Sequence, residues 1–265
     1  MDLDYWKKQE DEPLFPDIVW SRPESKINSG KLLIVGGHTQ GFSAVAKCYQ
    51  SATESGIGQI YLAIPSGLKK TVGELFPNIE YLEDTPLGSI SYKSKHNLVS
   101  LINAADSVIF CGDLGNNSET VKLVDEVIPN LNLPSVICGD AVSAIKNSAS
   151  TVLANPSLNL IANFGEIQRI LSSAGKGYLI KSDMGVLEVV KVLHEVTSES
   201  KCSITTRVSD YIINSFNGEA VTTKYSLEER GWDVSIASIM SVLTAQNLGT
   251  PIELLSTATH LANQP

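Results

Sequence analysis

From residue 31 onward, short apolar runs alternate with segments whose apolar residues recur every three or four positions. Runs that are apolar almost throughout are typical of strands buried on both faces. The runs expected to be strands lie at 31–35, 59–65, 106–112, 134–140 and 159–163. The segments with helical spacing lie at 43–56, 94–105, 116–129 and 164–173. This alternation predicts an α/β fold, with a mostly parallel central sheet and helices on both faces.

The pattern changes after a further amphipathic helix, which we expect over 185–196. Residues 202–208 have the composition of a strand, and residues 210–224 predict a β-hairpin. Asn217–Gly218 would form its turn, because this pair is favoured in two-residue hairpin loops. Two closing helices are expected over 234–247 and 251–262. The sequence therefore predicts antiparallel pairing only near the C-terminal part of the sheet.

Residues 1–30 differ from the rest of the chain because they are polar and contain several prolines. We interpret them as an N-terminal arm without a core of its own, followed by a single α/β domain over 31–265. Trp6, Phe15 and Trp20 are spaced along the arm. Exposed tryptophan usually has a contact to make, so we expect these aromatic residues to dock on the body or on a neighbouring subunit.

Composition and charge narrow the classes of function. The chain is 43% hydrophobic and 18% charged, which is typical of a globular protein. A net charge of -9 argues against sequence-independent binding of nucleic acid, which requires a basic face. No apolar run is long enough to span a membrane, and the N-terminus lacks the pattern of a signal peptide. We therefore expect a cytoplasmic protein whose partners are small molecules or other proteins.

The cysteines give no indication of a metal site. Cys48, Cys111, Cys138 and Cys202 are widely spaced, and no two form a CxxC pair, so a zinc site is not expected. Cys111 and Cys138 fall within predicted strands, where buried thiols are the simplest interpretation.

Four small, polar stretches follow predicted strands, where ligands gather in open parallel sheets. They are "GGHTQGFSA" (36–44), "GDLGNNSE" (112–119), "GDAV" (139–142) and "ANFGE" (162–166). Three lead into helices, whose first N–H groups can bind anions. The first matches neither the dinucleotide fingerprint nor the P-loop pattern. A glycine-rich turn of this kind is, taken alone, more often only a tight turn, and Asp113 and Asp140 are also compatible with simple helix caps.

Asp233 allows two interpretations. It precedes a helix in which Ile236, Ile239, Met240 and Leu243 form one stripe among small residues, which predicts a buried helix. Aspartate is a favoured N-cap, worth about 1 kcal/mol. A carboxylate at the mouth of a buried helix could also face a cleft and act as a catalytic base. The residues leave both possibilities open.

Taken in order over residues 30–262, these stretches resemble the ribokinase-like superfamily, and within it the ADP/ATP-dependent NAD(P)H-hydrate dehydratases. That family opens its first helix with a glycine-rich turn and Gly-Ala, where this chain has Ser43–Ala44. Its Gly-Pro-Gly loop resembles "CGDLGNNSET", which keeps Gly112. Its Asp-Ala-Asp-Ala-Leu stretch resembles "CGDAV", which keeps Asp140 but has Cys138 at the first aspartate.

Two further stretches complete the resemblance. The family's Thr-Pro-His-Pro-Gly-Glu resembles "IANFGE", which keeps Gly165–Glu166 and has Asn163 in place of histidine. Its Gly-x-Gly-Asp resembles "RGWD", in which Arg230 and Trp232 replace the glycines. Glycines there let backbone N–H groups surround a phosphate, so the nucleotide side departs most from the family. Asparagine can hydrogen-bond but cannot titrate as histidine would.

The resemblance implies a function and a set of residues. It implies that ATP or ADP, with Mg²⁺, drives the dehydration of hydrated NAD(P)H through phosphorylation of the substrate hydroxyl, with Asp233 as the base. It assigns nucleotide binding to Arg230, Gly231 and Trp232. It assigns binding of the substrate to Gly37, Ser43, Ala44, Gly112, Asp113, Asn117, Asp140, Asn163 and Glu166. It also implies a homo-oligomer.

Two alternatives stay open. The substituted glycines and Asn163 favour a non-catalytic protein of the same fold that binds a nucleotide-like ligand or a protein partner. A small-molecule kinase of the superfamily would use Asp233 in the same way as the dehydratase.

Overall fold

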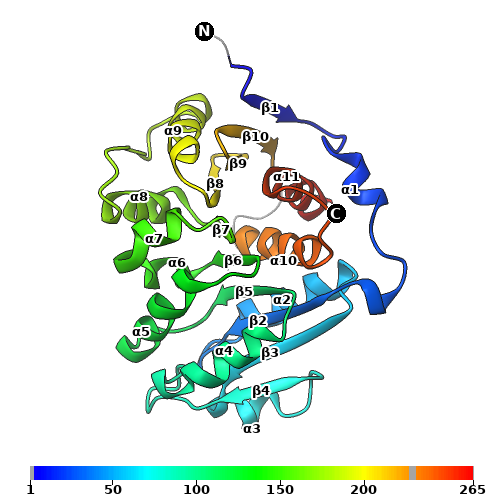
Figure 1. Ribbon diagram of the computed structural model, residues 1–265, viewed down its shortest axis with the longest axis vertical. Coiled ribbons are helices and arrows are strands. Elements are labelled where there is room, and N and C mark those ends of the chain that lie inside the picture. The colour runs from blue at the N-terminus through cyan, green and yellow to red at the C-terminus, as the bar shows by residue number, and fades with distance from the viewer. Residues whose placement is uncertain (1–2, 227–230, 265) are drawn as a thin grey trace.

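The computed structural model describes residues 3–226 and 231–264, which fold around one mixed β-sheet (Figure 1). Within these residues the sheet has ten strands in the order β1-β10-β9-β8-β7-β6-β5-β2-β3-β4. Strand β9 is antiparallel to β8 and β10, and all other neighbouring pairs are parallel. The strands are β1 (Trp6–Gln9), β2 (Lys31–Gly36), β3 (Gln59–Pro65), β4 (Ile79–Leu82), β5 (Ser107–Gly112), β6 (Ser135–Cys138), β7 (Leu158–Ile161), β8 (Ser203–Val208), β9 (Tyr211–Phe216) and β10 (Glu219–Lys224).

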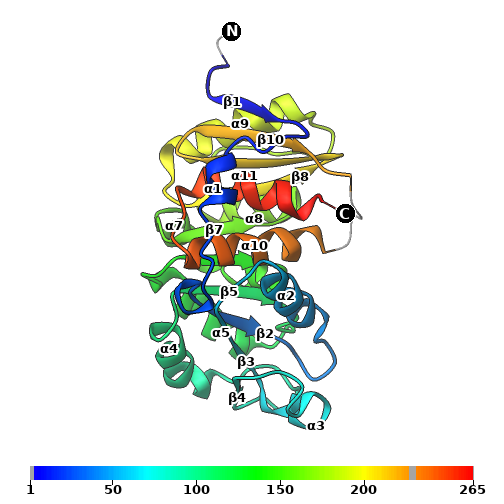
Figure 2. The same ribbon diagram turned by 90° about the vertical axis from the view of Figure 1, so that its right-hand side faces the viewer.

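Helices cover both faces of the sheet (Figures 1 and 2). One layer contains α4 (Lys95–Asn103), α5 (Ser118–Val127), α6 (Asp140–Ala144), α7 (Ala149–Leu153), α8 (Phe164–Ser173) and α9 (Val186–Glu199). The other contains α1 (Pro16–Trp20), α2 (Ser43–Glu54), α3 (Lys69–Val72), α10 (Trp232–Ala245) and α11 (Pro251–Ala262). The α/β class, the mostly parallel sheet and its covered faces are thus as predicted.

The two faces explain why the strands are apolar throughout. Successive side chains of a strand point to opposite faces. In β2, Leu33 and Val35 join the core cluster under the first helical layer, while Leu32 and Ile34 join the cluster under the second. Each central strand therefore needs apolar residues at consecutive positions.

The predicted hairpin is confirmed. Strands β9 and β10 pair in antiparallel register, and the turn between them is formed by Asn217 and Gly218. Their φ angles are 50° and 78°. Positive φ at both turn positions is what a type I′ turn requires, and Asn-Gly supplies it with little strain.

Two strands were missed. No strand is expected from the sequence between residues 65 and 106, yet β4 forms one edge of the sheet, beside β3. Of its four residues only Leu82 is buried, so β4 shows no continuous apolar run in the sequence. Strand β1 lies in the polar arm and pairs with β10, which adds a second unpredicted edge.

The arm docks on the body through some of its aromatic residues. Trp6 Nε1 donates a hydrogen bond of 2.9 Å to Thr222 Oγ1, and Tyr5 stacks on His194 with 3.7 Å between ring centroids. Phe15 packs against the core cluster under α10 and α11. The docking prediction is therefore confirmed for Trp6 and Phe15. Trp20, however, is 84% exposed, so it does not dock on its own chain.

Within the described residues, no helix combines the length and the apolar character needed to cross a membrane. All four cysteines are free and buried, as predicted for Cys111 and Cys138.

Candidate functional site

The carboxyl ends of β2, β5, β6 and β7 lie next to one another because these strands are parallel neighbours in the sheet. The four polar stretches singled out in the sequence follow these strands, so they meet at one edge of the sheet. Helix α10 packs against β5 and β6. A single region thus collects most of the predicted site residues.

Glycines let the loops of this region approach one another closely. Gly112 and Gly139 have φ of 102° and 59°, and a methyl group added at Gly139 would lie 3.1 Å from the Cα atom of Gly112. Gly37 donates its backbone N–H to the carbonyl oxygen of Gly112 at 3.2 Å. Gly37 and Gly112, both expected to contact substrate, therefore also hold the loops after β2, β5 and β6 together.

Asp113 joins the loop after β5 to the start of α2. Its Oδ2 atom accepts a hydrogen bond from the backbone N–H of Ala44 at 2.8 Å and one from Ser43 Oγ at 3.3 Å. Asp113, Ser43 and Ala44 thus form one contact group. Because Asp113 already supplies an anion to the N-terminus of α2, the N–H of Ala44 is not free to bind a phosphate.

Asp140 organises the neighbouring loop. It is the first residue of α6, after Gly139 at the N-cap, and its Oδ2 atom accepts N–H groups from Leu114 at 3.0 Å and Gly115 at 3.2 Å. Displacement of water by the surrounding loops raises the pKa of Asp140, and the Asp113 carboxylate adds to this rise, while the two N–H donors oppose it.

Asn117 and Asn163 act as helix N-caps. Asn117 Oδ1 accepts the N–H of Glu119 at 2.8 Å at the start of α5. Asn163 Oδ1 accepts the N–H of Glu166 at 2.9 Å, and Glu166 Oε2 accepts the N–H of Asn163 at 3.2 Å and its Nδ2 at 2.7 Å. This capping box uses both polar atoms of the Asn163 side chain. The N-termini of α5 and α8 therefore carry acceptors from their own segments.

Helix α10 begins differently. It starts at Trp232, two residues earlier than predicted, and ends at Ala245. Its N-cap is Gly231, in the left-handed conformation with φ of 72°, and no described side chain caps it. Asp233 is the second residue of the helix, so the interpretation of Asp233 as an N-cap is wrong. Arg230 lies outside the described residues.

The pKa of Asp233 is raised, chiefly because burial disfavours the charged carboxylate. The backbone N–H groups of Val234 and Gly139 and the ammonium group of Lys47 oppose this rise. The charge of Asp233 also contributes to the raised pKa of Glu166, after the larger effect of burial. A carboxylate with a raised pKa can accept a proton from a substrate. The helix N-terminus beside it favours the binding of an anion.

Lys47 was missed by the sequence analysis. A methyl group added at Gly231 would lie 2.7 Å from Lys47 Nζ, so the ammonium group lies directly over the start of α10. The one available signal was spacing, because Lys47 follows Ser43 by one helical turn on α2. Its position beside Asp233 places positive charge at the start of α10.

Trp232 does not cover the start of the helix. It is 8% exposed and belongs to the core cluster packed under α2, α10 and α11. Its ring therefore lies in the apolar interior, which leaves the N-terminus of α10 to Gly231 and Lys47.

The described residues contain no group of three or more His, Cys, Asp or Glu side chains that could hold a metal ion. Mg²⁺ that accompanies a nucleotide does not require such a group, because it is usually held by the phosphates, water and one or two carboxylates.

Comparison with known proteins adds to this geometry. No family model matches the chain. In sequence, the chain is 28% identical over 127 residues to a bifunctional NAD(P)H-hydrate repair enzyme Nnr of Thermofilum pendens, which covers 47% of this chain and 24% of that protein. It is 27% identical over 170 residues to the Nnr enzyme of Dictyoglomus turgidum, over 62% of this chain and 33% of that protein. The matches thus span a third or less of the length of these relatives.

Solved structures define the fold. A ribokinase-like superfamily protein of Enterococcus faecalis superposes with a TM-score of 0.74 at 14% identity, over 99% of this chain and 88% of the other. An ADP/ATP-dependent NAD(P)H-hydrate dehydratase of Bacillus subtilis, co-crystallised with ATP/Mg²⁺ and soaked with CoA, superposes with a TM-score of 0.65 at 14% identity, over 95% and 87%. The chain therefore has the ribokinase-like fold, and the predicted resemblance is confirmed.

Proposed function

We propose that the protein repairs hydrated NAD(P)H by a nucleotide-dependent dehydration in which Asp233 is the general base. The observation that carries the proposal is the start of α10, where Asp233 has a raised pKa beside Lys47 and a helix N-terminus without a side-chain cap. The sequence similarity to NAD(P)H-hydrate repair enzymes supports the choice of substrate.

Each group at this site has a defined part in the proposed reaction. Asp233 removes the proton from the substrate hydroxyl, and the resulting oxygen attacks the terminal phosphorus of ATP or ADP, from which the shorter nucleotide leaves. The N–H groups at the start of α10 that Asp233 does not engage, together with the ammonium of Lys47, stabilise the negative charge on the transferred group. Loss of phosphate from the phosphorylated carbon, with loss of a proton from its neighbour, then restores the double bond of NAD(P)H.

The alternative is a non-catalytic protein of the same fold. The observation in its favour is that these polar side chains already have partners within the protein. Asp113 accepts the N–H of Ala44 at the start of α2, and Asn163 and Glu166 hydrogen-bond to each other at the start of α8. Side chains used in this way hold loops together and leave fewer groups to bind a substrate. A protein of this kind would bind a nucleotide-like ligand and would not transfer a phosphoryl group.

Two measurements distinguish nucleotide binding from catalytic turnover. Thermal-shift titrations with ATP, ADP and AMP, each with and without Mg²⁺, report whether the folded protein takes a nucleotide, because a ligand bound to the native state raises its stability. Dehydration of hydrated NADPH is followed by the absorbance of the product. We expect a saturable shift with ATP or ADP and turnover of the hydrate.

Asp233→Asn is expected to keep the nucleotide shift and to lower turnover by about 100-fold or more, because the general base is lost. Asp17→Asn is the matched control, since Asp17 is likewise the second residue of its helix, α1, but is exposed. Turnover of Asp233→Asn close to that of the wild type contradicts the proposed mechanism. A nucleotide shift without turnover in the wild type supports the non-catalytic alternative.

A further inference from the structure

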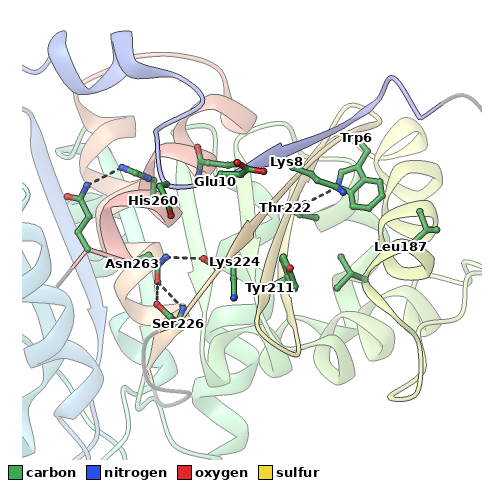
Figure 3. A pocket seen from close by; sticks show the side chains of 14 residues that line it. Trp6, Lys8, Glu10, Leu187, Tyr211, Thr222, Lys224, Ser226, His260 and Asn263 are labelled. Atoms are coloured by element: carbon green, nitrogen blue, oxygen red, sulfur yellow. Dashed lines mark hydrogen bonds between the residues drawn. The ribbon is translucent and has the colours of Figure 1, made fainter.

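A cavity of about 900 Å³ lies at the β1 edge of the sheet (Figure 3). It is bordered by β1, the end of β10, the start of α9 and the end of α11. Neither Asp233 nor Asp140 nor Gly231 is among its lining residues. Its volume is in the range of small-molecule sites, which is roughly 300–1,000 Å³.

Strand register places several of the lining side chains on one face. Lys8 aligns with Thr222 and Tyr211 aligns with Lys224, so the side chains of Trp6, Lys8, Thr222, Lys224 and Tyr211 share the face covered by α9. Residues of the opposite face, such as Gln9 and Thr223, are instead directed at α11. The alternation of three strands, β1, β10 and β9, thus brings the aromatic and basic side chains to one side of the cavity, while Gln9 and the end of α11 line the other side.

The Trp6 ring, which lines the cavity, is held in place by a hydrogen bond and by packing. The Trp6 indole is fixed by its hydrogen bond to Thr222 Oγ1, and it is partly buried against the core. Tyr211 and Leu187, which also line the cavity, are 38% and 40% exposed. A fixed indole and a phenol ring offer flat surfaces to another ring without a large loss of side-chain freedom.

The two lysines that line the cavity, Lys8 and Lys224, have no ion-pair partner among the described residues. Lys8 Nζ lies 4.9 Å from the centroid of the Trp6 ring. Among the described residues, neither Lys8 nor Lys224 is within ion-pair distance of a carboxylate, whereas Lys7, on the opposite face, pairs with Glu219 at 3.4 Å. Two ammonium groups without an ion-pair partner among the described residues, one of them beside the fixed Trp6 ring, favour an anionic ligand.

Carboxylates limit where the anion can bind. Glu10 and Asp11 also line the cavity, two and three residues after Lys8 in the arm. His260 lies at the α11 side of the cavity, with its Nε2 atom hydrogen-bonded to Gln264. The anion is therefore expected nearer Lys224, beside Tyr211, with Lys8 on the Trp6 side (Figure 3).

We propose that this cavity is a binding site for a planar aromatic anion: a one- or two-ring molecule that bears a phosphate, sulfonate or carboxylate. The rings lie against Trp6 and Tyr211, and the anionic group is bound by Lys224 and Lys8. Because Trp6 and Lys8 belong to β1, the arm completes the site. The site is independent of the proposed chemistry at Asp233.

The test uses the full chain and 2-naphthyl phosphate as the probe, in isothermal titration calorimetry. 2-Naphthol, which lacks the anion, and cyclohexyl phosphate, which lacks the aromatic rings, are the comparison ligands. We expect 2-naphthyl phosphate to bind at least about tenfold more tightly than either, since each comparison ligand loses one part of the recognition.

Lys224→Gln and Lys8→Gln are each expected to weaken binding of the probe by about tenfold, because a charge-assisted contact is lost. Lys7→Gln is the matched control on the opposite face of β1, and its affinity should equal that of the wild type. Trp6→Phe keeps an aromatic ring and should weaken binding less than Trp6→Leu. Circular dichroism establishes that each variant is folded.

Two results overturn the proposal. One is absence of binding in the wild type, or equal binding by the wild type and Lys224→Gln. The other is loss of probe binding when ATP saturates the protein, which would make the cavity part of the nucleotide site. Asp233→Asn is expected to bind the probe normally, so failure of the proposed dehydratase activity leaves this test unaffected.

Discussion

At the scale of single residues, Asp233 occupies a position that does not favour stability. Burial opposes its ionisation, and the N–H groups of Val234 and Gly139 and the charge of Lys47 only partly offset that effect. A residue that served the helix alone would sit at the N-cap, where an aspartate stabilises a helix. Asp233 instead lies two positions after the N-cap, Gly231, and we regard its burial there as a sign of function.

The raised pKa leads to a prediction about pH and stability. The pKa of Asp233 is higher in the folded state than its ordinary value of 3.8. Between these two values the folded protein holds a proton that the unfolded chain has lost, so its stability falls as the pH rises through this window. Above the window, the ionised carboxylate destabilises the folded state by a constant amount.

We therefore expect Asp233→Asn to have a larger free energy of unfolding than the wild type at about pH 7, and the difference to shrink as the pH is lowered to about 4. Urea unfolding of both proteins at several pH values measures this difference. Asp17→Asn, at the exposed second residue of α1, is the matched substitution for comparison. Lower stability of Asp233→Asn at neutral pH would contradict the expectation.

At the scale of elements, β1 is too short to be held on the sheet by backbone pairing alone, and its side chains help to attach it. It has four residues, but Gln9 is buried and makes three hydrogen bonds. Its Nε2 atom donates to Thr223 Oγ1 at 3.0 Å and to the carbonyl oxygen of Ser256 at 2.8 Å, and its Oε1 atom accepts the N–H of Leu14 at 3.0 Å. One side chain thus joins the arm, the sheet and α11.

Gln9→Ala should lower the free energy of unfolding by about 1–3 kcal/mol, because buried partners lose their hydrogen bonds. Lys7→Ala, which removes an exposed ion pair with Glu219, should change it by less than about 1 kcal/mol. Chemical denaturation measures both. Equal effects of the two substitutions would show that Gln9 does not anchor the arm. If β1 is released, the aromatic-anion site is also expected to weaken.

At the scale of the whole molecule, the arm leaves apolar side chains at the surface. Trp20 is 84% exposed and Ile27 is 93% exposed, although neighbouring parts of the arm dock on the body. Isolated exposed apolar residues are common, but an indole this exposed on a docked segment fits a contact between subunits. We propose that the chain forms a homo-oligomer through this part of the arm.

Sedimentation velocity at micromolar concentration is expected to show a species larger than the monomer. Trp20→Ser should shift it towards the monomer. Leu75→Ser is the control, because Leu75 is 76% exposed but lies outside the arm. A wild type that sediments as a monomer, or a Trp20→Ser protein that keeps the larger species, would argue against assembly through the arm.

The sequence by itself determined the α/β class, the covered faces, the hairpin and the edge of the sheet at which the polar stretches meet. These follow from local rules, because apolar periodicity and turn chemistry act over a few residues. The sequence did not reveal β1 and β4. Each is a four-residue edge strand with only one buried residue, so neither shows a run of apolar residues.

Only the tertiary structure decided which groups face one another. Lys47 lies over Gly231, Asp113 engages Ala44, and the Trp232 indole turns into the core. The arm cavity likewise depends on the pairing of β1 with β10, whose residues are more than 200 positions apart in the chain. Contacts at such separation are set by packing of the whole chain, which no local pattern of residues encodes.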